Sequence, residues 1–348
     1  MKHFRFSILI TIFAIIGIGI WSYTQGGMEY SIKVIFITIL LALMEISFSF
    51  DNAVVNASIL KTWNHYWQMM FLTIGMLLAV FGMRLFFPII IVSETSNMAI
   101  MDVWHMALYN PIQYSTILKA HHGEISAFGG IFLILVFLNF LIDKEKKLHW
   151  FHFIEKELSR LGRIHTLPTL ISLIFLVSIL FWVPQEHQFS TLFAGIWGVI
   201  IFLAVKIIGE ILESKHENTA TARKTVAKGG IGAFIYLEVL DASFSFDGVI
   251  GAFAITTDII IIMVGLGIGA FFVRSLTIYL VEKGTLDEYV YLEHGAHYAI
   301  GVLAILMLIG INYHKIPEIV TGLVGITFIL LSFYSSKKYM AKSLKHKK

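Results

Sequence analysis

The sequence predicts an all-α polytopic membrane protein with about ten transmembrane helices, and three observations support this fold class. Apolar residue types make up 57% of the 348 residues and charged types 14%, whereas soluble globular chains hold about 45–50% and about 25%. The apolar residues gather in ten runs of roughly the length that crosses a bilayer. Three of these runs recur in the same order later in the chain, which predicts an inverted repeat of three helices.

The ten runs follow from the need for about 20 mostly apolar residues per membrane helix. In chain order they are 5–22, 32–59, 66–91, 124–142, 167–183, 191–212, 230–256, 258–281, 296–313 and 317–335. The first run could be a signal peptide, but no small-residue cleavage site follows Trp21, so we expect a membrane helix. The long stretch 92–123 lies between two runs and predicts an interfacial or re-entrant helix.

The distribution of basic residues predicts the orientation. Lys and Arg favour cytoplasmic loops. If the N-terminus is cytoplasmic and the ten spans alternate, most of the 26 Lys and Arg residues lie on the cytoplasmic side, above all in 143–166, in 213–229 and in the tail. We therefore expect a bacterial inner-membrane protein with both termini in the cytoplasm.

We expect one integral membrane domain, 1–348, without a separate soluble domain. Its predicted parts are an extra helix (5–22), repeat A (30–142), a linking region of two helices between two basic loops (143–229), repeat B (230–313), and a last helix with a basic tail (317–348).

An acidic motif marks the second and seventh runs. An acid, Ser, Phe, Ser, Phe and Asp occur from Glu45 to Asp51 and again from Asp241 to Asp247, at an offset of 196 residues. The two runs that follow also share residues in register: Arg84 with Arg274, and His122 with His294. Counting from one to the next, the second motif helix comes five spans after the first, and an odd step means that the two helices should run in opposite directions. Inverted repeats of this kind place a binding site at the bilayer midplane, where the motif helices meet.

The acids within these runs predict a cation site. A carboxylate at the centre of a bilayer costs about 2.5–3.5 kcal/mol on insertion scales, so each one should be paired, protonated or bound to a cation. Carboxylate, amide and hydroxyl oxygens suit hard divalent cations. The predicted metal ligands are Glu45, Asp51, Asn52, Glu238, Asp241 and Asp247, with Ser49, Asn56 and Ser245 in support. Asp51 and Asp247 join the others only if the helices unwind near the Ser-Phe-Ser-Phe segment or if these two acids point to a neighbouring helix. The alternative is that these acids form buried ion pairs or hydrogen bonds that tie helices together.

Four further polar residues leave two interpretations open. Arg84 and Arg274 either pair with the carboxylates when no cation is bound or extend to the membrane surface. His122 and His294 either support a metal or proton site or lie in water at helix ends.

The sequence also excludes several functions. The chain has no cysteine, which rules out disulfides, thiolate metal sites and cysteine nucleophiles. No His-Glu-x-x-His or comparable hydrolase motif occurs, so we do not expect an enzyme.

The two acidic motifs resemble those of the TerC family, in the wider superfamily of LysE-type exporters. The first is Glu45 to Asn52, and the second is Glu238, Asp241, Phe244 and Asp247. The chain departs from that pattern at Gly248 and in its count of ten spans, so it resembles a sister group more than TerC itself. The resemblance implies Mn²⁺ export or metal-ion homeostasis, with a link to tellurite resistance.

Together these observations predict a secondary transporter of a divalent metal cation, Mn²⁺ or Ca²⁺, coupled to protons or to the membrane potential. The cation would be the substrate, and no prosthetic group is expected. The expected partner is the lipid bilayer, not nucleic acid, and a homo-oligomer is compatible with the sequence. Two alternatives remain: an exporter of a small organic solute such as an amino acid, and a membrane scaffold without transport.

Overall fold

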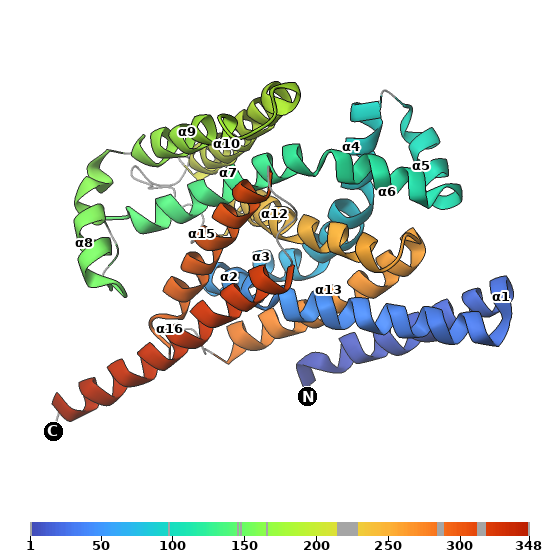
Figure 1. Ribbon diagram of the computed structural model, residues 1–348. Coiled ribbons are helices and arrows are strands. Elements are labelled where there is room, and N and C mark those ends of the chain that lie inside the picture. The colour runs from blue at the N-terminus through green and yellow to red at the C-terminus, as the bar shows by residue number, and fades with distance from the viewer. Residues whose placement is uncertain are drawn as a thin grey trace. The chain divides into compact units, whose positions relative to one another are not determined.

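The computed structural model describes residues 2–96, 98–144, 146, 148–164, 166–213, 229–283, 289–311 and 318–346, and every regular element in them is a helix. Within these residues, six helices are long and apolar enough to cross a membrane: Arg5–Phe48, His65–Glu94, His122–Leu141, Gln185–Ile208, Ile259–Glu282 and Leu292–Gly310. The predicted helical class is confirmed, and the apolar helices indicate a multi-pass membrane protein. The chain divides into two compact units, which we describe one at a time (Figure 1).

The first unit comprises Met1–Ala53, Asn64–His122 and Phe244–Tyr279. Its first element, α1 (Arg5–Phe48), is a hairpin of two helices, because the backbone of Gly26 and Gly27 is not helical. Gly27 has a φ of 74°, a conformation that costs little only for glycine. Across the hairpin, the Ser31 hydroxyl donates a hydrogen bond of 2.9 Å to the Gly19 carbonyl. The first two predicted runs are thus antiparallel neighbours.

The two acidic motifs differ in their backbone. The run 32–59 is interrupted at Ser49, where α1 ends and α2 (Phe50–Leu60) begins, inside the Ser-Phe-Ser-Phe segment where we expected unwinding. In contrast, α12 (Ile231–Ile255) continues without a break through the same segment of the second motif. Unwinding, one of the two ways in which Asp247 could join the other acids, therefore does not occur in α12. Its glycines, including Gly248, are accommodated within a regular helix.

The remaining elements of the first unit follow the predicted runs. The span His65–Glu94 contains α3 (His65–Met70), two π-helical stretches (Phe71–Gly75 and Leu78–Phe86) and most of α4 (Phe87–Ser96). The stretch 92–123 also holds two short helices, α5 (Ile100–Tyr109) and α6 (Pro111–Ala120). The last element, α13 (Ile259–Glu282), packs against α1, and the Ser7 hydroxyl lies 2.6 Å from the Ser275 hydroxyl.

The second unit comprises Val54–Trp63, Gly123–Ser243 and Leu280–Lys348. Its helices besides parts of α2 and α12 are α7 (His122–Leu141), α8 (His152–Arg160), α9 (Leu167–Leu180), α10 (Gln185–Glu213), α15 (Leu292–Gly310) and α16 (Glu318–His346). The core of this unit is α7, in which Ile131, Phe132 and Leu133 are fully buried. Helix α15 lies between α7 and α16, since Gly301 meets Phe137 of α7 and Gly295 meets Ser332 of α16.

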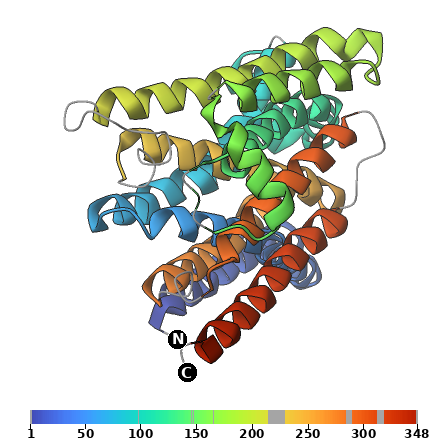
Figure 2. The same cartoon turned by 90° about the vertical axis from the view of Figure 1, so that its left-hand side faces the viewer.

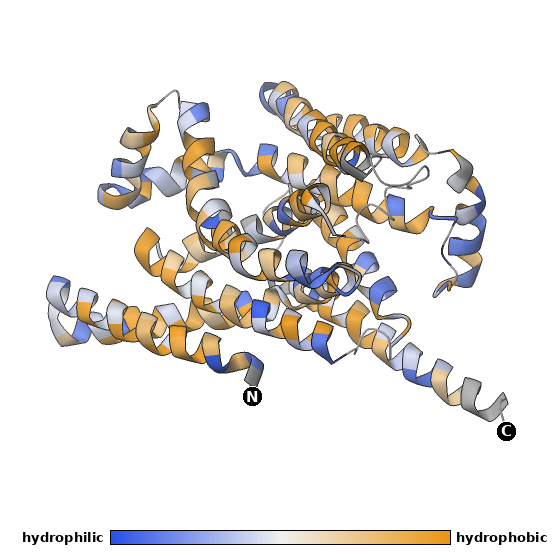
Figure 3. Cartoon of the chain, turned by 180° about the vertical axis from the view of Figure 1, so that it is seen from behind, coloured by the Kyte–Doolittle hydropathy of each residue, from blue (hydrophilic) through white to orange (hydrophobic). Residues whose placement is uncertain are grey.

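Two predicted boundaries need correction. Helix α9 has 14 residues and ends at Leu180, because Pro184 and a turn follow. Helix α16 continues to His346, past the predicted end at 335, because Lys-rich residues extend it beyond the apolar run. Most of the basic segment 213–229 lies outside the described residues, so its placement stays a prediction. Figure 3 shows that hydrophobic residues predominate along α1. Apolar side chains of this helix, such as Phe13 and Phe36, are exposed, as expected where lipid surrounds a helix.

Candidate functional site

Glu45 of the first motif is held in a buried ion pair. Its side chain is 3% exposed, and Oε1 lies 2.6 Å from Nη2 of Arg84, which is also 3% exposed. The Ser49 hydroxyl, one turn further along, donates a second hydrogen bond of 2.9 Å to the same oxygen. Arg84 therefore lies in an ion pair with one of the acids and does not extend to the surface.

The local backbone explains how Arg84 reaches this position. Arg84 belongs to the π-helical stretch Leu78–Phe86, and its Nη1 donates a hydrogen bond of 2.7 Å to the carbonyl of Ala79, five residues earlier. A π-helix widens the turn and frees carbonyl groups, and such stretches are frequent at functional sites. The guanidinium therefore bridges its own helix and Glu45.

Glycines of two other helices make room for Glu45. A Cβ atom at Gly269 of α13 would overlap the Cβ and Cγ atoms of Glu45, and one at Gly248 of α12 would lie 3.0 Å from its Oε2. Gly269 therefore needs a residue without a side chain, whereas a Cβ at Gly248 would require only a small shift of the Glu45 carboxylate. The close approach explains why Glu45 is almost completely shielded from solvent.

Asp51 and Asn52 lie in the first turn of α2. Asp51 is 8% exposed and Asn52 is 4% exposed. The Asp51 carboxylate accepts a hydrogen bond of 2.9 Å from the backbone N–H of Asn52. A carboxylate at a helix N-terminus is stabilised by the unpaired N–H groups there. Asp51 is thus stabilised locally, within its own helix.

The second motif brings two acids and an amide together in the second unit. On α12, Glu238 and Asp241 are 6% and 8% exposed and lie three residues apart, on one face of the helix. Asn56 of α2 is 4% exposed, and its Nδ2 donates a hydrogen bond of 3.2 Å to Oδ1 of Asp241. Neither carboxylate oxygen of Glu238 has a hydrogen-bond partner among the described residues, and the same holds for the carbonyl oxygen of Asn56.

The other residues expected at the metal site are placed as follows. Ser245 is 4% exposed, one turn beyond Asp241 on α12. The side chain of Asp247 lies outside what the structure describes, although its backbone is part of α12. Arg274 is half-buried, with its guanidinium 5.5 Å from the ring centroid of Phe6. Within the described residues, no group of three or more His, Asp or Glu side chains could hold a metal ion.

The two histidines have separate surroundings. His122 is the first residue of α7 and is partly exposed. His294 is 5% exposed in the first turn of α15, and its Nε2 lies 2.9 Å from the carbonyl of Leu148. The interpretation of His294 as a helix-end residue in water is therefore wrong, because the segment after α7 covers it.

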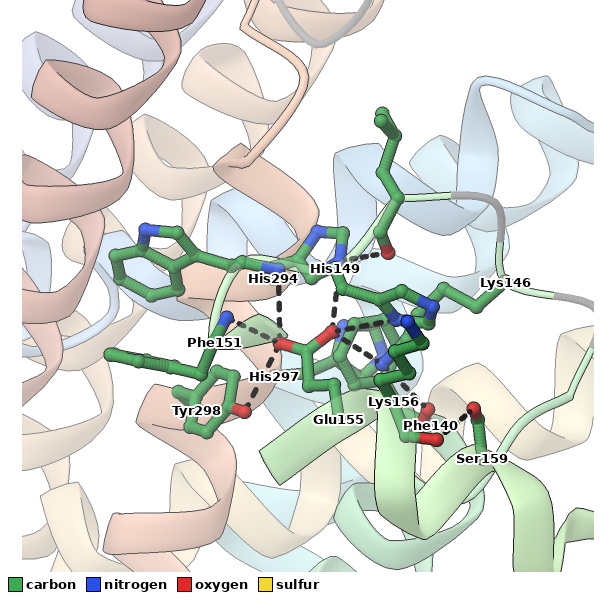
Figure 4. Close-up of polar contacts among 12 residues, drawn as sticks. Phe140, Lys146, His149, Phe151, Glu155, Lys156, Ser159, His294, His297 and Tyr298 are labelled. Carbon is green, nitrogen blue, oxygen red and sulfur yellow. Dashed lines mark hydrogen bonds and ion pairs between the residues drawn. The ribbon is translucent and has the colours of Figure 1, made fainter. Parts of the chain in front are cut away.

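Glu155 of α8 is fully buried. Its carboxylate contacts the segment that follows α7 (Figure 4). Its Oε2 lies 2.9 Å from Nζ of Lys146 and 3.5 Å from both His149 and His294. Its Oε1 accepts hydrogen bonds from the backbone N–H of Phe151, at 3.2 Å, and from the hydroxyl of Tyr298, at 3.1 Å.

The position of Glu155 also determines its ionisation. Burial alone would raise the pKa of this carboxyl, but the hydrogen bond and the charge of Lys146 outweigh it and hold the pKa below its ordinary value. Sequence reasoning missed this cluster because Glu155 stands in a segment that we counted only for its Lys and Arg residues. A single acid among basic and aromatic residues gives no periodic signal.

Comparisons with known proteins identify a family and correct the earlier resemblance. No curated protein and no solved structure matches the chain. A family model described as "Protein of unknown function (DUF475)" matches residues 50–342. The assignment to a sister group of TerC is therefore wrong. Two short acidic motifs were too little to identify a family, because they cover only a few residues of the 348. The match covers more than half of the chain, and the protein belongs to the DUF475 family.

Proposed function

We propose that the protein is a secondary membrane transporter of a divalent metal cation, Mn²⁺ or Ca²⁺. The observation that carries the proposal is the buried carboxylate of Glu238, which has no hydrogen-bond partner among the described residues. Asp241 and the unpaired carbonyl oxygen of Asn56 accompany it.

The chemistry of these groups favours a cation. A buried charged group without a partner costs several kcal/mol, about 2.5–3.5 kcal/mol for an acid in a membrane helix on insertion scales. Two carboxylates and an amide carbonyl are the oxygen ligands that Ca²⁺ and Mn²⁺ take, usually with further protein oxygens or water. A cation that binds here displaces any proton that the carboxylates carry, so cation movement would be coupled to protons.

The Glu45–Arg84 pair in the first unit fits the alternative that these acids form buried ion pairs, so the proposed cation site rests on the second unit. This carboxylate is neutralised by an internal cation, so a substrate cation would have to compete with Arg84 for it. The pair also agrees with the alternative, an organic ammonium substrate, because a guanidinium already fits beside this carboxylate.

The proposal includes the architecture expected from the sequence: ten spans, an inverted repeat, an inner-membrane location and cytoplasmic termini. The bounds of α12 and α16 support two spans beyond the six apolar helices, since these helices have 25 and 29 residues. The three acids of α12 fit a helix that faces a protein-lined site better than one that faces lipid.

Cation binding to purified protein tests the proposal. We expect Mn²⁺ to bind the wild type and the affinity to fall by about tenfold or more in Glu238→Gln, which removes one anionic ligand and keeps the shape. Glu157→Gln removes an exposed acid of α8 and should leave the affinity unchanged. Equal binding by all three proteins, or no binding of Mn²⁺ or Ca²⁺ to the wild type, would refute the site.

A further inference from the structure

Helix α8 lies where the chain passes between two apolar helices. It begins at His152, after α7 ends at Leu141, and it ends at Arg160, before α9 begins at Leu167. Figures 1 and 2 both show α8 running across the direction of α9. If α7 and α9 cross the bilayer, a short helix between them with this orientation lies along the membrane surface.

The inward face of α8 is fixed by Glu155. This carboxylate contacts Lys146 from the preceding segment and Tyr298 and His294 from α15 (Figure 4). It also accepts hydrogen bonds from two backbone N–H groups just before α8, those of Trp150 and Phe151. One buried side chain therefore sets which face of the helix points away from the protein.

That outward face combines large apolar and basic side chains. Phe153 is 87% exposed, Ile154 51%, Leu161 45% and Ile164 52%. Lys156 and Arg160 are exposed on the same helix, and Arg160 forms an exposed ion pair of 2.6 Å with Glu157, which it would exchange for a lipid phosphate. Large exposed apolar side chains next to Lys and Arg on one helix are typical of helices that lie in the interface of a bilayer.

We propose that α8 and the residues up to Ile164 form an interfacial helix that binds the anionic headgroup region of the adjoining leaflet. The apolar side chains enter the boundary between headgroups and acyl chains, and Lys156 and Arg160 contact lipid phosphates. Each basic residue near an anionic surface contributes about fivefold to binding. The membrane that α7 and α9 cross is continuous with this surface, which favours lipid over a soluble protein as its occupant. This inference does not depend on the transport proposal.

Spin labels test the proposal, because the chain has no cysteine and a single one can be introduced at will. Ile154→Cys places a label on the apolar side of α8, and His152→Cys places one about 160° away on the same helix. In vesicles of phosphatidylcholine with phosphatidylglycerol, we expect the label at 154 to be accessible to oxygen but protected from a water-soluble nickel complex. The label at 152 should show the reverse.

The anionic component is tested separately. In phosphatidylcholine alone, or in Lys156→Gln/Arg160→Gln with the anionic lipid, exposure of the label at 154 to nickel should rise several-fold. Nickel accessibility that is high at both positions, or low to both reagents at 154, would overturn the interfacial helix. Protection at 154 that is the same with and without anionic lipid would overturn the headgroup assignment.

Discussion

The buried ion pair of Glu155 makes the sharpest prediction about stability. Glu155→Gln keeps the shape and still accepts hydrogen bonds from Phe151 and Tyr298, but it removes the charge opposite Lys146. Lys146 has a side chain that is 3% exposed, so its ammonium group would lose this carboxylate without gaining contact with water, although it keeps a hydrogen bond of 3.4 Å to the Phe140 carbonyl. Breaking a buried pair by removing one partner costs about 3–5 kcal/mol of unfolding free energy. We expect this loss, measured by denaturant unfolding of the purified protein followed through tryptophan fluorescence, because Trp150 lies beside the cluster.

The matched control is on the same helix. Glu157 pairs with Arg160 at 2.6 Å, but its side chain is 55% exposed, so Glu157→Gln should cost less than about 1 kcal/mol. A double variant, Glu155→Met/Lys146→Met, removes both charges and should regain most of the stability lost by either single variant. The reasoning is refuted if Glu155→Gln is as stable as Glu157→Gln, or if the losses at 155 and 146 simply add.

Three further predictions follow from the described contacts. Arg84→Gln leaves Glu45 buried without the guanidinium and should cost about 3–5 kcal/mol of unfolding free energy. The double variant Arg84→Gln/Glu45→Gln should regain much of this loss, and thermal unfolding measures both. Gly269→Ala should destabilise the protein by about 1–3 kcal/mol, because the added Cβ overlaps Glu45. Gly17→Ala is the control, since no atom lies within 4 Å of its added Cβ. Equal stability of the two variants would contradict the tight packing at Gly269. The pKa of Glu155 is lowered in the folded protein, so its ionised carboxylate stabilises the fold at pH values above the ordinary pKa of a glutamate. This stability is lost as the pH falls through the lowered pKa. An acid titration of unfolding should show the loss below about pH 4 in the wild type and not in Glu155→Gln.

The helical fold was predictable because its cause is local. Each apolar run is long enough to pack against neighbours or lipid, and each is mostly helical in its described residues. The hairpin at Gly26 and Gly27 was foreseen only as a gap between two runs, since backbone conformation at a glycine leaves no hydropathy signal. The break at Ser49 was expected, but its absence from α12 was not, because the same residues fit both a broken and a regular helix.

The site was predictable only in part. Helical spacing predicts that Asn56 lies on the polar face of one motif helix and that Glu238 and Asp241 lie on the polar face of the other. A hydrogen bond joins Asn56 to Asp241. Helical spacing could not single out Arg84 as the partner of Glu45, because this pairing depends on a π-helical stretch that frees the carbonyl of Ala79. The resemblance to TerC failed because the two short motifs cover only a few residues of the 348.

Cation flux into proteoliposomes tests the central claim most directly. With an inward gradient of Mn²⁺ or Ca²⁺, we expect wild-type protein to carry the cation and to move protons the opposite way. Glu238→Gln and Asp241→Asn should lose most of this flux while they unfold at wild-type temperatures. Glu157→Gln should transport normally. Wild-type flux no greater than that of empty liposomes, or full flux in both variants at positions 238 and 241, would contradict the account.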